Sequence, residues 1–364
     1  MFKNHLKVAF RHFTKNRSFS LINLFGLSVG LAAAFAVLLY VQDEVSYENH
    51  HENAAQIVRV NLEASFDGKT YNLGTTPNRV APFLKDQLPE IKEALRVFPH
   101  NFGESASIRV NNENFVEPKL YWADPNLLDV LTLPLVAGDA KTALDRTNTV
   151  MISQSTAQRY FGLASPIGKT IQIDSRYDME VTAVFKDMPA NTHLPFNVIG
   201  AFQTINLGKP ERLSWGNASF YTFLLLNEGT DIPTVETKIQ AVAKENIPEE
   251  SQWYQLQLKP LLDLHLYSED MEGDNTNYGD INQVWILIGL ALILVLIACI
   301  NYMNLATAKS QQRSKEVAVN KTLGATSQQM AAQFYTETAL LALVGLMLSG
   351  MLLSLTLPLS LIHI

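Results

Sequence analysis

The first residues that could do chemistry form a loop with two glycines, a lysine and a threonine. Gly162-LASPI-Gly168-Lys169-Thr170 invites comparison with a phosphate-binding loop, but five residues separate its glycines where that motif needs four. The segment after Thr170 (IQID) has the pattern of a strand, whereas a phosphate site needs a helix N-terminus there. We therefore expect a turn followed by a strand, and no nucleotide site.

The histidines do not show metal-ligand spacing. His50, His51 and Glu52 are consecutive, so their side chains are expected to diverge, and no H-E-x-x-H pattern occurs. His193 and His265 are isolated in the sequence, and we expect a structural role for each. There is no convincing pairing of a nucleophile with a base. The sequence thus gives no positive evidence for an enzyme, and it predicts no catalytic residue, metal or cofactor.

Three uncharged runs are long enough to cross the hydrocarbon core of a bilayer as helices. They are residues 21–41, 284–305 and 338–357. An AFA tripeptide at 34–36 has the form of a signal-peptidase site. The apolar run is nevertheless longer than that of a typical signal peptide and continues to residue 41, so we expect an uncleaved anchor. These runs predict a multi-pass α-helical membrane protein.

The charges are distributed unevenly along the chain. Of the 28 Lys and Arg, nine lie outside residues 42–283, whereas only two of the 35 Asp and Glu do. Basic flanks favour the cytoplasmic side of a membrane, so we expect a cytoplasmic N-terminus and an extracytoplasmic region at 42–283. The net charge of −7 argues against nucleic acid as a partner.

Residues 1–20 have an amphipathic pattern. Basic residues recur every fourth position, beside an apolar stripe that includes Phe2, Leu6 and Phe10. Such a helix is expected to lie on the cytoplasmic face of the membrane, in contact with anionic lipids. The alternative is the positive flank of a signal sequence. The basic residues of the stripe are Lys3, Lys7, Arg11 and Lys15.

Residues 42–283 mix strand-like and helix-like segments, which predicts a large α+β extracytoplasmic domain between the first and second membrane helices. Helices are expected at 77–88, at 153–161 with Ser153 as N-cap and Gly162 as the stop, and at 234–245. A second lobe could begin near 187–195. The strand-like segments are 56–62, 95–99, 106–110, 115–121, 149–152, 170–174, 180–186, 220–226 and 255–259.

The membrane helices and the basic loop at 306–337 carry further patterns. Gly26-x-x-x-Gly30 would allow a neighbouring helix to approach closely. The polar side chains of Asn301 and Asn304 are costly to expose to lipid, so we expect them to form hydrogen bonds within a helix bundle. The alternative is that they line a substrate pathway. In the loop, a basic helix at 309–323 is expected to stop at Gly324, and Thr326-x-x-Gln329 fits a capping box that begins the helix containing the third apolar run.

Residues 285–345 resemble the conserved core of the FtsX-like permeases, also called the MacB-type ABC-transporter permease family. The segments that carry the resemblance are NYMNLATA (301–308), RSKEVAVNKTLGA (313–325) and QFYTETALLAL (333–343). The start of the chain (2–32 and 46–60) is similar to the family as well. The middle resembles its extracytoplasmic core domain through DPNLLDVLTLPLVAGD (124–139), VMISQSTAQRYFG (150–162) and VTAVFKDMPANTHLPF (181–196).

The resemblance implies a non-catalytic permease subunit in a bacterial inner membrane. Its loop at 306–337 would couple to a separate cytoplasmic ABC ATPase, and ATPase dimerisation would be transmitted to the extracytoplasmic domain. Export or extraction of a lipoprotein, peptide or drug is the implied work. The implied partners include a second permease copy or homologue and a periplasmic or outer-membrane protein. The coupling residues carried over are Arg313, Glu316, Leu323, Gly324 and Ala325.

Two points qualify this prediction. Members of the family usually have at least four membrane helices, whereas here the third run, placed at 338–361, meets Pro358 near the last residue, so we expect a truncated chain. A receptor with two membrane helices around a ligand-sensing domain is the alternative function. A receptor would continue into a long soluble region, whereas this chain soon enters the membrane again. A membrane-anchored hydrolase would need a catalytic motif.

Overall fold

The computed structural model describes residues 17–66, 68–268, 271–272, 278–312 and 314–360. Its backbone contacts divide the chain into two compact units. One combines the residues up to Asp43 with those from Ile281 onward, and the other runs from Glu44 to Asp280. Residues 1–16 of the expected amphipathic helix and Arg313 of the loop lie outside the described residues.

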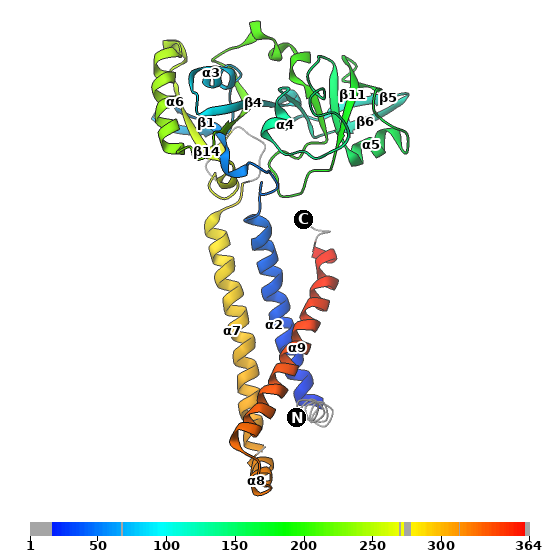
Figure 1. Ribbon diagram of the computed structural model, residues 1–364, viewed down its shortest axis with the longest axis vertical. Coiled ribbons are helices and arrows are strands. Elements are labelled where there is room, and N and C mark those ends of the chain that lie inside the picture. Colours follow the sequence, from blue (N-terminus) through cyan, green and yellow to red (C-terminus); the bar gives the residue numbers. More distant parts are fainter. Residues whose placement is uncertain (1–16, 67, 269–270, 273–277, 313, 361–364) are drawn as a thin grey trace. The chain divides into compact units, whose positions relative to one another are not determined.

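In the part of the chain that the structure describes, the first unit consists of three long helices and one short one (Figure 1). The long helices are α2 (Arg17–Glu44), α7 (Ile281–Gln312) and α9 (Ser327–Ser360). Each contains a stretch long and apolar enough to span a membrane: Leu21–Glu44, Ile281–Leu305 and Ser327–Thr356. The short helix α8 (Ser314–Thr322) precedes α9, which remains helical through Pro358.

The second unit, called the domain below, is built on one sheet that contains fifteen strands among the described residues. The hydrogen-bonded order is β15-β2-β1-β13-β4-β7-β12-β9-β11-β10-β5-β6, with β14 on β1, β3 on β13 and β8 on β11. The strands are β1 (Ile57–Phe66), β2 (Lys69–Leu73), β3 (Thr76–Pro77), β4 (Ile91–Pro99), β5 (Ala106–Val110), β6 (Glu113–Glu117), β7 (Leu120–Ala123), β8 (Leu135–Gly138), β9 (Thr149–Ser153), β10 (Thr170–Ile173), β11 (Tyr177–Phe185), β12 (Val198–Ala201), β13 (Ala218–Leu226), β14 (Tyr254–Pro260) and β15 (Met271–Glu272).

Neighbouring side chains of a strand point to opposite faces of the sheet, so they belong to different hydrophobic cores. Val58 and Val60 of β1 pack with Leu224 of β13 under the helices α3 (Val80–Gln87) and α6 (Ile232–Asn246). Ile57 and Phe223, one position away, belong to the core on the other face, which includes the short helix α4 (Leu127–Val130). Helices therefore cover both faces of this part of the sheet (Figure 1).

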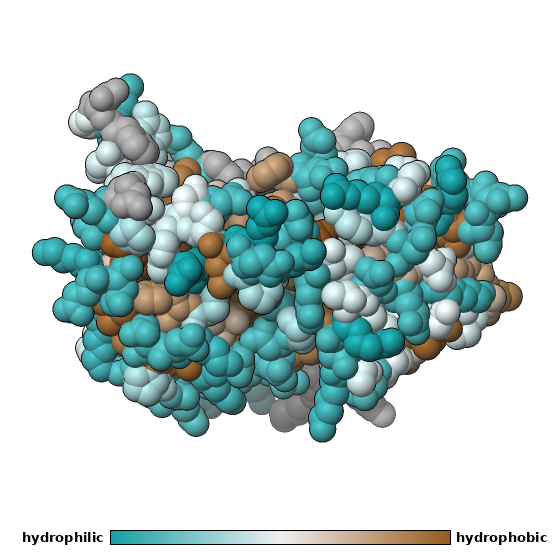
Figure 2. Space-filling view, turned by 90° about the horizontal axis from the view of Figure 1, so that it is seen from above, coloured by the Kyte–Doolittle hydropathy of each residue, from teal (hydrophilic) through white to brown (hydrophobic). Residues whose placement is uncertain are grey.

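A third core lies beneath the helix α5 (Gln154–Phe161), around Trp122, Val150 and Ile171. Ser153 caps this helix by accepting a hydrogen bond from the N–H of Thr156, and Gly162 ends it with a φ of 61°, so both expected ends of α5 are confirmed. Figure 2 shows one face of the domain, where hydrophilic side chains predominate over scattered hydrophobic ones. That face suits an aqueous compartment.

Several sequence-based predictions of strands need correction. The single strand expected at 115–121 is two strands, β6 and β7, because Pro118 lies between them and has no N–H for a sheet ladder. The short strands β2, β8 and β12 were not expected. Each has only four or five residues, too few for a periodic pattern to stand out.

Candidate functional site

A buried carboxylate, that of Glu48, lies at the centre of a densely hydrogen-bonded polar group in the domain. Glu48 Oε1 accepts hydrogen bonds from the backbone N–H of His193 at 2.6 Å and from its ring Nδ1 at 2.9 Å. The other oxygen, Oε2, accepts from His51 Nε2 at 3.1 Å. The Thr192 hydroxyl lies 3.1–3.2 Å from both oxygens. The two oxygens of Glu48 therefore have several donors each.

Two short segments of chain meet at this group. The first linker (residues 44–51) follows the apolar part of α2, and the second linker (residues 278–280) precedes α7. Glu44 of the first linker accepts a hydrogen bond from His265 Nε2 at 2.8 Å, and the Tyr47 ring stacks on His265 with centroids 3.5 Å apart. The N–H of Gly279, in the second linker, bonds to the carbonyl of His265 at 2.9 Å.

The second linker is also held by Tyr278. Its hydroxyl accepts a hydrogen bond from the buried Arg59 of β1 at 2.8 Å, and its ring lies 5.8 Å from that of His193. We call this set of side chains the Glu48 cluster. It comprises Glu44, Tyr47, Glu48, His51, Arg59, Thr192, His193, His265 and Tyr278. The cluster joins both linkers to the body of the domain.

The hydrogen bonds decide the charge of Glu48. Burial alone would raise its pKa, because a buried carboxylate loses the solvation of its charged form. The hydrogen bonds from His193 and His51 outweigh burial and hold the pKa of Glu48 well below its usual range. Glu48 is therefore an ionised acceptor, although its side chain is only 2 % exposed.

The backbone at Glu48 is strained. Its φ is 61°, in the left-handed region that residues other than glycine rarely adopt. Hydrogen bonds fix the segment on both sides, since the N–H of Glu48 bonds to the carbonyl of Asn191, and the Asn191 amide bonds to Ser46. Such strain persists only where the surroundings hold it in place. Loss of the Glu48 side chain should therefore release the first linker.

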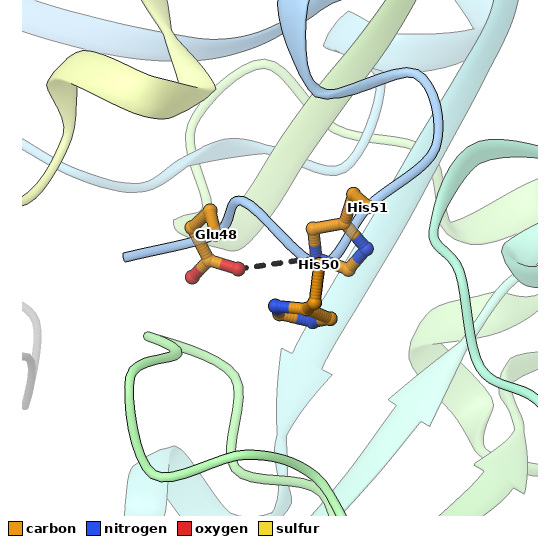
Figure 3. A group of neighbouring side chains, drawn as sticks. All are labelled: Glu48, His50 and His51. Carbon is orange, nitrogen blue, oxygen red and sulfur yellow. Dashed lines mark hydrogen bonds and ion pairs between the residues drawn. The ribbon is translucent and has the colours of Figure 1, made fainter. Parts of the chain in front are cut away.

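Glu48, His50 and His51 are close enough to be tested as a metal site, since their ligand atoms lie within 4.8 Å of one another (Figure 3). His51 does not fit that role. Its Nδ1 accepts a hydrogen bond from the N–H of Thr132 at 3.0 Å, so the neutral ring carries its proton on Nε2 and donates it to Glu48. A metal-bound histidine normally donates through its other nitrogen.

His50 alone cannot complete a site. Burial lowers the pKa of His50 against the opposing charge of Glu48, which favours the neutral ring. The centroids of the His50 and His51 rings lie 4.0 Å apart, which overturns the expectation that these neighbouring side chains diverge. With Glu48 bonded to four donor groups and His51 fixed as a donor, we regard the three residues as a hydrogen-bonded group and assign them no metal.

The expected coupling residues lie at the other end of the chain. Helix α8 carries the backbone of Glu316, and Gly324 follows it with a φ of 88°, which favours glycine. Leu323 is 79 % exposed and Ala325 partly so. The capping box is present, because Thr326 Oγ1 accepts from the N–H of Gln329 at 3.3 Å and Gln329 Oε1 accepts from the N–H of Thr326 at 3.0 Å.

Three of the four residues expected in helix packing, Gly26, Gly30 and Asn301, lie where α2 and α7 approach each other. A Cβ atom added at Gly26 would lie 2.6 Å from Asn301 Nδ2, and one added at Gly30 would lie 2.8 Å from the Cβ of Ala298. Both glycines therefore allow close approach. Asn304 is exposed in this unit. Residues 26–30 (GLSVG) also fit a G-x-S-x-G pattern, but they lie inside a helix instead of the strand-to-helix turn that a nucleophile needs.

Sequence reasoning missed the Glu48 cluster because its members are far apart. Glu48 and His193 are separated by 145 residues, and Glu44 and His265 by 221. Histidine and carboxylate pairs at such separations carry no periodic signal. The one local signal is the three-residue spacing of Glu48 and His51.

Comparison with known protein families decides the assignment. Residues 20–242, more than half of the chain, match the model of the MacB-like periplasmic core domain. Residues 288–364 match the FtsX-like permease C-terminal model. The chain belongs to the MacB/FtsX-type permease family. This permease is thus a multi-pass membrane protein whose α+β domain is extracytoplasmic, as the sequence predicted.

Relatives of this permease are ABC transporter components. The macrolide export ATP-binding/permease protein MacB of Aggregatibacter actinomycetemcomitans is 25 % identical over 260 residues, which cover 70 % of this chain and 37 % of MacB. The ABC transporter permease YvrN of Bacillus subtilis is 22 % identical over 94 % of this chain and 84 % of its own. This permease thus spans little more than a third of that MacB.

A solved structure also resembles the permease. The periplasmic region of MacB from Actinobacillus actinomycetemcomitans superposes with a TM-score of 0.42 and 16 % identity, covering 57 % of this chain and 90 % of that one.

Proposed function

We propose that this permease carries motion from a cytoplasmic ABC ATPase across the membrane to its extracytoplasmic domain. The observation that supports this most is the Glu48 cluster, which binds the linkers of both α2 and α7 in one hydrogen-bonded group. A change in the spacing or rotation of the two helices therefore reaches the domain at one point. Rigid elements with two positions are the usual carriers of such coupling.

The cytoplasmic end of this pathway is the loop at 306–337. We infer that Arg313, Glu316, Leu323, Gly324 and Ala325 contact a separate ATPase subunit. Leu323 and Val319 are exposed apolar residues four positions apart, so they form one small face at the end of α8. The capping box at Thr326 fixes the start of α9, and it gives the loop the stiffness that a coupling element needs.

The topology follows from the charges. We propose that the N-terminus and the loop at 306–337 are cytoplasmic and that the membrane is the bacterial inner membrane. The exposed apolar side chains of α7, such as Ile286 and Leu292, suit contact with lipid or with a second permease copy. A periplasmic or outer-membrane protein is a further expected partner of the domain.

The work done by the transporter is proposed as export or extraction of a lipoprotein, peptide or drug. The relative MacB is named as a macrolide export ATP-binding/permease protein. No residue of the membrane unit needs to contact the substrate in this mechanism, because the moving part is the extracytoplasmic domain. ATP hydrolysis is assigned to the partner subunit.

Co-purification tests the partnership directly. We expect the full-length permease to retain an ABC ATPase encoded beside it and to stimulate its ATP hydrolysis in lipid. The Leu323→Asp variant should lose both properties. The matched control is Leu163→Asp, which changes an exposed leucine of the domain, 102 % exposed, and should bind the ATPase normally. Full binding and stimulation by Leu323→Asp would refute the assignment of this loop.

A further inference from the structure

A cavity of about 410 Å³ lies in the domain beside the Glu48 cluster. Tyr47 and His193 of the cluster line it, together with the beginning of β7 and Gly103, the last residue of the turn at His100–Gly103. Its volume falls within the range of about 300–1,000 Å³ that is typical of small-molecule sites. The cavity is part of the domain alone and involves no residue of the helical unit.

The lining of the cavity is aromatic and positively charged. Tyr47, Tyr121 and Tyr221 supply rings with polar edges, and Lys119 supplies a charged and exposed ammonium group. No acidic side chain is among the described residues that line the cavity. Tyrosine rings favour a flat apolar partner, and a lysine favours an anion.

His193 has an unused nitrogen at this cavity. Its Nδ1 donates to Glu48, but its Nε2 is buried and has no hydrogen-bond partner among the described residues. The side chain is only 5 % exposed. Buried polar groups are nearly always paired, so a single unpaired nitrogen indicates a missing water or ligand. Because His193 lines the cavity, a molecule bound there is the natural partner.

Gly103, which lines the cavity, ends a strained but well-supported turn. Asn101 and Phe102 have φ values of 45° and 60°, both in the left-handed region. His100 anchors the turn, because its Nδ1 accepts from Trp122 Nε1 at 3.0 Å and its Nε2 bonds to Asp174 at 2.7 Å. Strained backbone that neighbours hold in place is common where a binding surface is preorganised.

We propose that this cavity binds a small anionic molecule that carries an aromatic ring. The anionic group lies at the ammonium group of Lys119, a hydrogen-bond donor of the molecule meets His193 Nε2, and the ring packs against the tyrosines. Because Tyr47, Thr192 and His193 also hold the first linker, an occupied cavity stiffens that linker. This last effect rests on the proposed function, whereas binding itself does not.

The test uses the full-length permease in lipid nanodiscs and two matched probes, N-acetylphenylalanine and its neutral amide. Saturation-transfer NMR titrations should show that the acid binds about tenfold more tightly than the amide, the scale of one charge-assisted hydrogen bond. Lys119→Met should reduce the affinity for the acid to that for the amide. The control Lys141→Met changes an exposed lysine outside the cavity and should bind both probes as the unmodified protein does.

Three results would overturn the proposal: no binding of either probe, equal binding of both, or an unchanged affinity for the acid in Lys119→Met. A second variant, Tyr121→Leu, tests the aromatic part and should weaken both probes alike. Melting curves confirm that each variant is folded. ATPase stimulation is measured on the same preparations, so a failed cavity and a failed coupling mechanism give different results.

Discussion

Glu48 accepts hydrogen bonds from the backbone N–H and the ring Nδ1 of His193, at 2.6 and 2.9 Å, across 145 residues of sequence. This pair fastens the segment that leaves α2 to the loop that precedes β12. The second linker reaches the same cluster through Tyr278 and Gly279. The two connections between the membrane helices and the domain thus depend on one group of side chains.

Removing the charge of Glu48 should destabilise the domain. Glu48→Gln keeps one oxygen but places an N–H₂ group where donors already point, so we expect the free energy of unfolding to fall by about 3–5 kcal/mol. Chemical denaturation of the full-length protein, followed by near-ultraviolet circular dichroism, measures this change. Glu104→Gln alters an exposed carboxylate and should change stability by less than about 0.5 kcal/mol. Equal effects of the two substitutions would contradict the role of Glu48.

The same residue predicts a dependence of stability on pH. Hydrogen bonds lower the pKa of Glu48 in the folded state relative to 4.5, its usual value, so the unfolded state takes up a proton first as pH falls. The stabilisation from Glu48 is therefore complete above its unfolded pKa and declines steadily below it. Between pH 7 and pH 3, Glu48→Gln should lose less stability than the unmodified domain. Parallel stability curves would show that Glu48 titrates normally.

The turn after α8 offers a conformational test. Gly324 has a φ of 88° and open space where a Cβ would lie, so Gly324→Ala introduces backbone strain without a clash. We expect this strain to cost about 1–2 kcal/mol. If the loop must keep its conformation when it binds the ATPase, the same cost weakens ATPase binding by about 5–30-fold. Titration with the purified ATPase measures this effect. Gly350→Ala, at another open position in α9 but with ordinary φ, should bind as the unmodified permease does.

The close approach of α2 and α7 can be tested by a pair of substitutions. Gly30→Ala would place its Cβ 2.8 Å from that of Ala298, so the helices must separate, at a cost of about 1–3 kcal/mol. Ala298→Gly removes the obstructing atom. The double variant should therefore be more stable than the sum of the two single changes predicts, as measured by melting in lipid. The control is Gly289→Ala, where an added Cβ meets no atom within 4 Å.

Most of the fold could be predicted from the sequence because the signals that specify it are local. The three apolar runs, the Ser153 cap with its Gly162 stop, and the capping box at Thr326 each occupy only a few consecutive residues. Helix caps and stops depend on a few neighbouring residues, so they form in the same way wherever the segment lies in the fold. Short strands such as β12 (Val198–Ala201) were missed because four apolar residues fit a strand or a buried turn equally well.

The Glu48 cluster and the cavity beside it could not be predicted in this way. His193 and His265 have no sequence neighbour that marks them as partners of carboxylates, and the fold alone brings them within hydrogen-bonding distance. The left-handed φ of Glu48 was equally hidden, since glutamate gives no sign of such a conformation. The coupling residues came from family resemblance, and their role remains a prediction.

The most direct test of the account is a distance measurement across the domain during the ATPase cycle. Spin labels at Glu104→Cys and Lys244→Cys, in a Cys299→Ser background, report the separation of two exposed sites, one in the loop before β5 and one in helix α6. In permease reconstituted with its ATPase, we predict that trapping with ATP and vanadate shifts this distance, and that Glu48→Ala abolishes the shift while ATP binding persists. An unchanged distance in the unmodified permease, or an equal shift in the Glu48→Ala variant, would contradict transmission through the Glu48 cluster.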